Sequence, residues 1–162
     1  MLEITALSRA HDRARFDCGV PELNAFLKAT ARQHGNKGIS RTFVLTDQSS
    51  PVIIGFFTLT LCEVMTENLP AGFAKKYPQH DLPAVRLARL AVSRKHQGKG
   101  SGELLLTEAI HRTCLIAEQA GVIGLFVDAK NDSARSFYQR YGFVTLAQPL
   151  HLFLPIETLR AL

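Results

Sequence analysis

The sequence predicts an α/β or α+β fold built around a mixed β-sheet. Segments rich in β-branched and aromatic residues alternate with segments whose apolar residues recur at helical spacing. Their order along the chain is a helix, a β-hairpin, and then strand, helix, strand, helix and strand. No repeat, low-complexity block or linker interrupts the 162 residues, so we expect a single domain over residues 1–162.

The first half of the chain predicts one helix and a hairpin. Pro21 opens the helical pattern, and proline suits the first helical position because its missing N–H is not needed there. The residues on one face of this helix are Leu23, Phe26, Leu27 and Thr30. Strands are expected over residues 41–46 and 52–61, which are β-branched and aromatic and flank a polar turn. Residues 63–83 contain three prolines and predict an irregular loop that is a candidate for function.

The second half predicts alternating strands and helices. A strand over residues 85–92 leads into a glycine-rich turn and a long helix. A buried strand follows over residues 122–127, and then a short helix that Asn131 or Asp132 caps. The residues on one stripe of the short helix are Ala134, Phe137, Tyr138 and Tyr141. Residues 143–154 complete the sheet.

The charge distribution indicates where an anionic partner would bind. Lys and Arg number 19 against 14 Asp and Glu, which gives a formal net charge of +5. Residues 82–102 contain five basic residues and no acidic one. These are Arg86, Arg89, Arg94, Lys95 and Lys99. Since the remainder of the chain balances at 14 against 14, this stretch accounts for the whole surplus and favours an anionic ligand there.

The cysteines and the apolar segments indicate a cytoplasmic protein. Cys18, Cys62 and Cys114 lie far apart, which fits neither a disulfide framework nor a metal knuckle, so we expect no metal. The longest strongly apolar run, residues 52–62, is shorter than the ~20 residues that a membrane-spanning helix needs. The N-terminus lacks the pattern of a signal peptide, so we expect no membrane contact.

The strongest chemical signal is the glycine-rich turn between a strand and a helix. Gly98, Gly100 and Gly102 remove side chains where a ligand could approach the backbone, and they permit positive φ angles. The N–H groups and positive dipole end of the following helix would add to an anion-binding site. The spacing fits neither a Walker A loop nor the G-x-G-x-x-G dinucleotide motif. By itself, such a turn is more often purely structural.

Two segments in the right order resemble the signatures of the GNAT superfamily of N-acetyltransferases. Residues 97–102 fit its Gln/Arg-x-x-Gly-x-Gly/Ala pattern, and residues 131–143 are similar to its Asn…Ala…Phe-Tyr…Gly-Phe signature. The resemblance implies a mixed, mostly antiparallel sheet flanked by helices, with acetyl-CoA in a V-shaped splay between two parallel strands. It assigns acetyl-CoA binding to Leu90, Ala91, Val92, Gln97, Gly98, Lys99, Gly100, Ser101, Gly102 and Asn131.

The same resemblance makes Tyr138 the catalytic acid that protonates the departing thiolate of coenzyme A. Acetyl transfer from a thioester to an amine needs a neutral amine, polarisation of the developing oxyanion and a proton donor for sulfur. A phenol with an ordinary pKa of about 10 can be that donor. Without the signature, Tyr138 would be interpreted as an amphipathic core residue, and Tyr141 on the same stripe is expected to pack. Neither Glu63 nor His96 is assigned as general base, because a lone Glu at a strand end is usually solvated and a lone His is usually incidental. Water is the alternative acceptor of the proton.

A narrower resemblance covers almost the whole chain. Residues 16–27 are similar to the Phe-x-Cys-Gly…Leu-x-x-Phe-Leu opening of the GNAT toxins of bacterial toxin–antitoxin systems. Residues 41–44 and 87–92 also look like segments of these toxins. The resemblance implies that the chain acetylates the α-amine of aminoacyl-tRNA and stops translation. It further implies a ribbon–helix–helix antitoxin as partner, and it leaves a homodimer open.

Arg86 and Arg89 are the candidate contacts to the tRNA. They lie on opposite faces of one predicted strand because side chains alternate along a strand. Arg89 interrupts an otherwise apolar run, so its charge must be paired or must face a cavity. A structural ion pair and a contact to the acceptor stem are both consistent with that position.

Two other functions stay open at this point. The same chemistry could act on a small amine or a protein N-terminus, without toxicity. A regulatory module could bind coenzyme A or nucleic acid without turnover, although the intact Tyr138 and the complete loop argue against it. Residues 16–27 and 41–44 favour the aminoacyl-tRNA substrate over a small amine.

Overall fold

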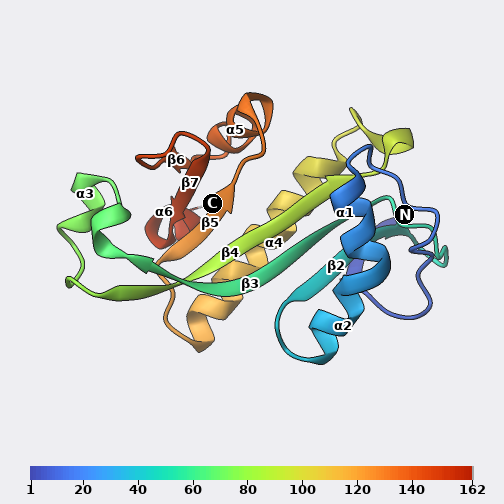
Figure 1. Cartoon of the computed structure of the whole chain (residues 1–162), viewed down its shortest axis with the longest axis horizontal. Helices are drawn as coiled ribbons and strands as arrows, with labels where there is room; N and C mark the ends of the chain where they lie inside the picture. Colours follow the sequence, from blue (N-terminus) through green and yellow to red (C-terminus); the bar gives the residue numbers. More distant parts are fainter. Residues whose placement is uncertain (162) are drawn as a thin grey trace. The chain divides into compact units, whose positions relative to one another are not determined.

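The computed structural model describes residues 1–161, and Figure 1 shows their helices and strands in chain order. Seven strands of these residues form a mixed sheet in the order β1-β2-β3-β4-β5-β7-β6. The strands are β1 Leu2–Ala6, β2 Arg41–Asp47, β3 Gly55–Met65, β4 Asp81–Val92, β5 Gly124–Asp128, β6 Val144–Thr145 and β7 His151–Pro155. The α-helices are α1 Pro21–Ala25, α2 Ala31–Asn36, α3 Ala71–Ala74, α4 Ser101–Gln119, α5 Asp132–Gln139 and α6 Ile156–Ala161. None of these helices is long and apolar enough to cross a bilayer.

The chain forms two compact units. The first contains residues 1–60 and 88–109, and the second contains residues 61–87 and those from 110 onward. Strands β3 and β4 and helix α4 each contribute residues to both units. The single domain over residues 1–162 therefore stays a prediction.

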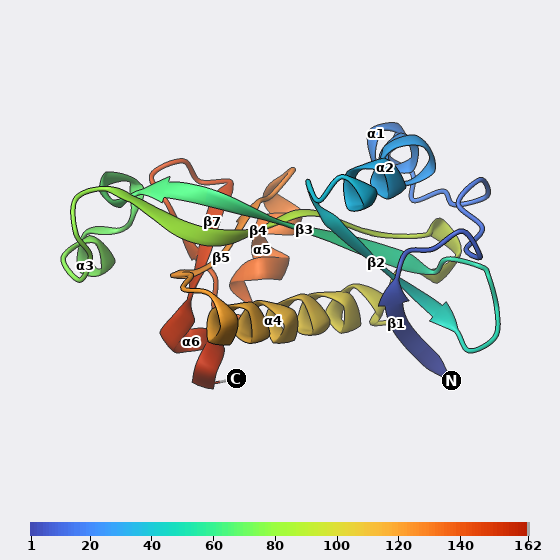
Figure 2. The same cartoon turned by 90° about the horizontal axis from the view of Figure 1, so that it is seen from below.

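The strands of the first unit are antiparallel. β1 pairs with β2, and β2 pairs with β3 so that Leu45 lies opposite Gly55, which confirms the predicted hairpin. Figure 2 shows α1 and α2 together on one side of β2. β1 was not predicted, although apolar Leu2, Ile4 and Ala6 alternate with polar Glu3 and Thr5 as in a short strand.

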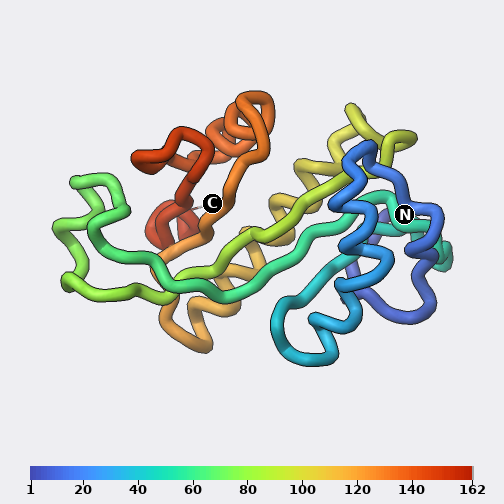
Figure 3. The backbone as a smooth tube through the Cα atoms, in the orientation of Figure 1, coloured from blue at the N-terminus to red at the C-terminus, as the bar shows by residue number. Residues whose placement is uncertain are grey.

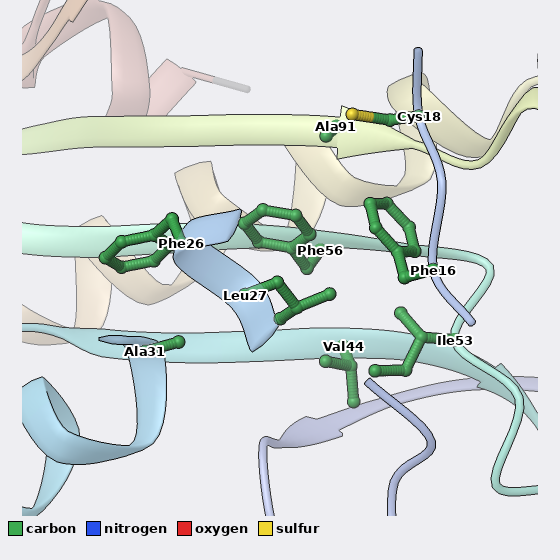
Figure 4. Packing of buried hydrophobic residues seen from close by; sticks show 9 residues of the cluster. All are labelled: Phe16, Cys18, Phe26, Leu27, Ala31, Val44, Ile53, Phe56 and Ala91. Atoms are coloured by element: carbon green, nitrogen blue, oxygen red, sulfur yellow. The ribbon is translucent and has the colours of Figure 1, made fainter. Parts of the chain in front are cut away.

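The core of the first unit forms between the helical segment and these strands. The helix predicted from Pro21 is confirmed, but a π-helical turn, Phe26–Thr30, separates α1 from α2. The buried cluster, shown in Figure 4, consists of Phe16, Cys18, Phe26, Leu27, Ala31, Val44, Ile53, Phe56 and Ala91. The Phe56 ring meets Phe16 edge-on, with 5.4 Å between centroids, and stacks on Phe26 at 6.5 Å. Because Phe16 is buried there, residues 16–27, which we call the opening segment, are anchored to this core.

The second unit contains the parallel strand pair that the fold class requires. β4 and β5 run parallel, with Val85 opposite Leu125 and Leu87 opposite Val127, while β5–β7 and β6–β7 are antiparallel. The tube in Figure 3 follows the chain from β5 through α5 into β6 and β7. The buried cluster of this unit consists of Val64, Leu69, Leu82, Ala84, Ile123, Phe126 and Phe153. The mixed, mostly antiparallel sheet with flanking helices confirms the predicted fold class.

Several predicted boundaries were wrong, and the irregular loop is the largest case. β3 continues to Met65 and β4 begins at Asp81, so the loop is shorter than residues 63–83 and holds a 3-10 turn, Thr66–Asn68, and α3. β4 passes through Pro83 because the carbonyl oxygen of that residue still accepts a hydrogen bond, 2.9 Å long, from Ile123 N–H. The strand predicted over residues 143–154 is two strands, β6 and β7, and α6 was not predicted.

Candidate functional site

The glycine-rich turn forms an open backbone loop at the N-terminal end of α4. Gly98 and Gly100 have φ angles of +78° and +85°, which L side chains rarely adopt. Nothing lies within 4 Å of where a Cβ atom would stand at either position, so the loop offers bare backbone to a ligand. α4 begins at Ser101, and its first N–H groups and positive dipole end add to the loop. This arrangement suits a phosphate or pyrophosphate group.

Gly102 lies inside the helix and not in the loop. It belongs to the first turn of α4, and it is not among the described glycines with positive φ. The prediction of a positive φ at Gly102 was therefore wrong, because the helix begins at Ser101. A glycine at this place still keeps side-chain bulk away from the helix N-terminus.

The three basic side chains of the loop differ in what holds them. Arg94 Nε lies 3.6 Å from Asp17 Oδ2, and the Arg94 N–H donates to the Asp17 carbonyl oxygen at 2.9 Å. Lys95 and Lys99 are exposed and form no ion pair with any residue in the described range 1–161. Arg94 therefore fixes the loop to the opening segment, while Lys95 and Lys99 remain for an anionic ligand.

The opening segment is ordered by two polar residues that sequence reasoning did not single out. Asp17 Oδ1 accepts hydrogen bonds from Gly19 N–H at 2.9 Å and from the Asn24 amide at 3.0 Å. Asn24 Oδ1 in turn accepts from Cys18 N–H at 2.9 Å. The hydrogen bonds from Gly19 and then from Asn24 hold the pKa of Asp17 below its ordinary value, with a smaller contribution from Arg94. The sequence did contain a signal for these two residues, because polar residues that flank a predicted helix start, here Pro21, often form hydrogen bonds to the backbone there.

Gln97 joins the loop to the strand that precedes it. Its side-chain amide donates to the Val92 carbonyl oxygen at 2.9 Å and to the Cys18 carbonyl oxygen at 3.1 Å. Both N–H donors of the amide are thus used within the protein. Gln97 consequently positions the loop relative to β4 and the opening segment, and a direct contact to coenzyme A stays a prediction.

We expect Gln97→Glu to weaken the loop without unfolding the protein. The carboxylate would face two carbonyl oxygens with no donor between them, and because Gln97 is exposed we expect a cost of about 1 kcal/mol. The KM for acetyl-CoA should rise several-fold in steady-state assays, and the melting temperature should fall by a few degrees. The exposed residue Gln33 provides the matched control, because Gln33→Glu makes the same change with no such partners. Equal KM values in both variants would contradict a positioning role for Gln97.

The end of β4 presents the backbone of Leu90, Ala91 and Val92 immediately before the loop. Ser93 N–H donates to the Ile54 carbonyl oxygen at 2.8 Å, which ties this strand end to the chain entering β3. A Cβ atom on Gly55 would lie only 2.8 Å from the Ala91 carbonyl oxygen. The glycine therefore allows β3 to approach β4 closely at Ala91.

Tyr138 lies on α5 in the second unit, with its ring buried. The ring packs against Phe137 at 5.3 Å and Phe143 at 5.4 Å between centroids. Burial raises the pKa of its phenol well above the ordinary value. The hydroxyl has no hydrogen-bond partner within the described chain. Its oxygen atom is not completely buried and so remains accessible from the surface. Tyr141 meets Phe137 edge-on at 5.3 Å, as expected of a packing residue.

Asn131 caps α5, which settles which of the two predicted residues does so. Its Oδ1 accepts a hydrogen bond from Ala134 N–H at 2.9 Å, and its extended backbone is typical of an N-cap. The cap fixes the start of the helix that carries Tyr138. A contact from Asn131 to coenzyme A stays a prediction.

Arg86 forms an ion pair in the second unit. Its Nη1 lies 2.7 Å from Asp128 Oδ2, and the other carboxylate oxygen lies 3.7 Å from His151 Nε2. Asp128 and His151 are opposite each other on β5 and β7, so their side chains share one face of the sheet. All three line a cavity of about 460 Å³, with Glu63 and Gln148 also on its wall. Asp128 is a site candidate that sequence reasoning missed.

Arg89 lies in the first unit without a carboxylate partner. Its guanidinium carbon stands 3.6 Å from the centroid of the Phe26 ring, a close cation–π contact. Partial burial lowers the pKa of this group. Arg89 has no ion pair with any residue from 1 to 161, so the ion-pair interpretation applies to Arg86 and not to Arg89.

The predicted site residues are divided between the two units. The first unit brings together residues 90–92, the loop 97–102 and Arg89. The second holds Tyr138, Asn131 and Arg86. Of the two candidates for general base that sequence reasoning declined to assign, Glu63 lines the cavity, and His96 Nδ1 lies 2.7 Å from Ser93 Oγ.

The chain matches an acetyltransferase family and is similar to two bacterial toxins. Residues 38–145 match the family described as acetyltransferase (GNAT) domain. A probable toxin TacT of Sinorhizobium fredii is 32% identical over 161 residues, covering 94% of this chain and 89% of that protein. A tRNA-acetylating toxin of Mycobacterium tuberculosis is 35% identical over 157 residues, covering 96% and 93%.

Solved structures are similar over nearly the whole chain. AtaT complexed with acetyl-methionyl-tRNAfMet has a TM-score of 0.91 and 34% identity, covering 99% of this chain and 98% of that one. AtaTR bound with AcCoA has a TM-score of 0.85 and 35% identity, covering 99% and 96%. A mutant AtaT toxin bound to the C-terminus of the antitoxin AtaR has a TM-score of 0.81 and 31% identity, covering 99% and 95%.

Proposed function

The chain belongs to the GNAT acetyltransferase family, and on that premise we propose that it is a toxin that transfers an acetyl group from acetyl-CoA to the α-amine of aminoacyl-tRNA. The observation that carries the proposal is the open loop of Gly98 and Gly100 at the start of α4. A relative at 35% identity is a tRNA-acetylating toxin, and a similar structure holds acetyl-methionyl-tRNA. These likenesses favour aminoacyl-tRNA over a small amine or a protein N-terminus.

The donor side of the reaction belongs to the first unit. Acetyl-CoA is the substrate that supplies the acetyl group, and its pyrophosphate fits the bare backbone of the loop and the N–H groups of α4. Lys95 and Lys99 add positive charge without competition from a carboxylate. The backbone of Leu90, Ala91 and Val92 supplies hydrogen bonds to the pantetheine arm and an N–H group to the acetyl oxygen, which stabilises the negative charge that develops there.

The leaving group needs a proton, and Tyr138 is the residue we assign to that step. The amine nitrogen bonds to the acetyl carbon, the carbon–sulfur bond breaks, and the phenol donates its proton to the sulfur. A phenol is protonated at neutral pH even at its ordinary pKa of about 10, and burial, which raises the pKa of Tyr138, keeps it protonated at higher pH as well. The proton lost by the amine passes to water, and the Tyr138 phenolate takes up a proton from water before the next turnover.

The acceptor side draws on both candidate arginines in different ways. Arg89 keeps an uncompensated charge above Phe26, so we assign it a contact to a tRNA phosphate. Arg86 is held by Asp128, so its charge is already compensated and its role is to shape the cavity wall. That cavity, with polar groups beside apolar lining, has the chemistry of a pocket for the aminoacyl end of the substrate.

The proposed activity also determines compartment and partners. A protein that acetylates aminoacyl-tRNA works in the cytoplasm, where charged tRNA is used. An antitoxin of the ribbon–helix–helix class would keep such a toxin inactive, consistent with the antitoxin complex of a similar structure. A homodimer is part of the proposal as well.

Expression of the chain alone should arrest growth, and the purified protein should transfer radiolabelled acetyl groups to charged tRNA. Uncharged tRNA has no α-amine and provides the control, since it should accept no label. The products are separated by acid gel electrophoresis and counted. Normal growth with soluble protein, or transfer only to polyamines or peptides, would overturn the proposal.

A further inference from the structure

The first unit contains a hollow of about 310 Å³ that is lined by three arginines and no acidic residue. Arg9 follows β1, Arg32 lies in the first turn of α2, and Arg41 begins β2. The other lining residues are Leu7, Ser8, Ala31, Gly35, Asn36 and Thr42. Leu7 N–H donates to the Thr42 carbonyl oxygen at 2.9 Å, which holds the chain after β1 beside the start of β2. Three separate parts of the chain thus each contribute an arginine to the lining of one hollow, which we name the arginine pocket.

The three guanidinium groups of the arginine pocket are uncompensated. None of them forms an ion pair or a hydrogen bond with another residue of the described chain. Each carries five N–H donors and stays charged at every physiological pH. Like charges around one hollow repel each other, so an anion bound among them would both remove that repulsion and accept the free donors.

The charge of the first unit supports an anionic occupant. This unit contains eleven Lys and Arg against seven Asp and Glu, and so carries four of the five net positive charges of the chain. The stretch 82–102 explains the surplus along the sequence, but it contributes none of the arginines of this pocket. The pocket is therefore a second basic feature of the same unit, built from different residues.

We propose that the arginine pocket binds a backbone phosphate of the tRNA, which deepens the proposed function and rests on it. A phosphate has oxygens in a tetrahedral arrangement, and donors that arrive from three elements can bind several of them at once. A carboxylate of an acidic protein segment offers two oxygens in one plane and would leave part of this donor set unused. None of the residues assigned to acetyl-CoA or to proton donation lines the pocket, so it would contribute to binding of the tRNA and not to acetyl transfer itself.

The test compares a large and a small acceptor. Arg9→Gln, Arg32→Gln and Arg41→Gln are assayed singly and together, with charged tRNA and with an aminoacyl-adenosine that lacks the tRNA body. For charged tRNA, KM should rise about tenfold per lost contact, and the slope of log KM against log salt should fall by about one. The kcat for charged tRNA and the KM for aminoacyl-adenosine should stay unchanged. Arg160→Gln, an exposed arginine of the second unit, is the matched control and should change neither.

The outcomes separate this inference from the proposed function. If wild-type protein fails to acetylate charged tRNA, the proposed function is wrong. If wild-type protein is active and the three variants keep its KM and salt slope, the pocket does not bind tRNA. Equal losses on both acceptors would mean that the arginines act through the fold, which also overturns the inference. Variants that lose only their affinity for the antitoxin would make the pocket a protein-binding site instead. Arg32→Lys keeps the charge without the planar fork, so an intermediate KM would support bidentate phosphate binding.

Discussion

Replacing Tyr138 with phenylalanine should lower kcat for acetyl transfer about 10²–10⁴-fold, the usual contribution of a positioned general acid. The ring contacts with Phe137 and Phe143 do not involve the hydroxyl, so packing should survive. The hydroxyl has no hydrogen-bond partner in the described chain, and its removal leaves no protein group unpaired. The KM for acetyl-CoA should change little, because the loop of Gly98 and Gly100 is untouched. Steady-state kinetics with charged tRNA and a thermal melt measure both effects.

Tyr141→Phe provides the matched control for this experiment. Tyr141 belongs to the same aromatic cluster, since its ring meets Phe137 at 5.3 Å. Its hydroxyl has no assigned role in the reaction, so kcat should stay within a factor of two or three of wild type. A large loss in Tyr141→Phe together with an active Tyr138→Phe would show that the catalytic tyrosine had been misassigned.

The pH profile gives an independent readout of Tyr138. Because burial raises its pKa in the folded protein, the phenol stays neutral as pH rises past the ordinary value of about 10. The kcat of the wild type should therefore show no fall between pH 8 and about 10 from loss of this acid. The raised pKa also means that this group supports folding below pH of about 10 and ceases to do so as pH climbs through the folded pKa. The assay should use an acceptor whose aminoacyl group is linked by an amide, because the ester of charged tRNA hydrolyses at alkaline pH. A fall in kcat centred below pH 9 would contradict the assignment of Tyr138 as the proton donor.

Replacing Gly55 with alanine should lower the stability of the fold where β3 approaches β4. The new Cβ atom would lie 2.8 Å from the Ala91 carbonyl oxygen and 2.8 Å from Leu105 Cδ1. The Ala91 carbonyl oxygen belongs to the backbone of a buried strand residue and cannot move away freely. We therefore expect the free energy of unfolding to fall by about 1–3 kcal/mol. The displaced Ala91 carbonyl belongs to the strand end that we assign to the pantetheine arm. The KM for acetyl-CoA should consequently rise along with the fall in stability.

Gly72→Ala makes the same chemical change without the crowding. Nothing lies within 4 Å of a Cβ at Gly72, and the residue sits in α3 with no positive φ, so stability should stay the same or rise slightly. Urea denaturation measures both variants. A Gly55→Ala protein as stable as wild type would mean that β3 and β4 are not in close contact at Ala91.

Features that depend on neighbours in sequence were predicted well. Pro21 marked the start of a helix, the two β-branched runs formed the antiparallel hairpin, and Asn131 capped α5. The prediction of positive φ angles at Gly98 and Gly100 was also correct, because a glycine-rich turn between a strand and a helix is a local pattern. Periodicity, capping and positive φ all arise within one turn or one strand, so a window of residues is enough to show them.

Boundaries and ion pairs were predicted less well. Pro83 was expected to lie outside a strand, but a hydrogen bond from Ile123, forty residues away, keeps it inside β4. Arg86 and Arg89 looked alike in sequence. In the fold, Arg86 forms an ion pair with Asp128, whereas Arg89 lies over the Phe26 ring. Asp17 and Asn24 passed unnoticed because their importance depends on the loop residues Arg94 and Gln97.

The sequence by itself determined the fold class, the family resemblance, and the residues proposed to bind acetyl-CoA and protonate its thiolate. The tertiary structure alone decided which charges are free. Arg9, Arg32 and Arg41 are far apart along the chain and meet in one hollow without a carboxylate, whereas Arg86 and Arg94 are each held by an aspartate. The physical reason is that a charge is compensated only by a partner within a few ångströms, and such partners lie on elements far apart along the chain. The composition of the sequence does not contain these distances.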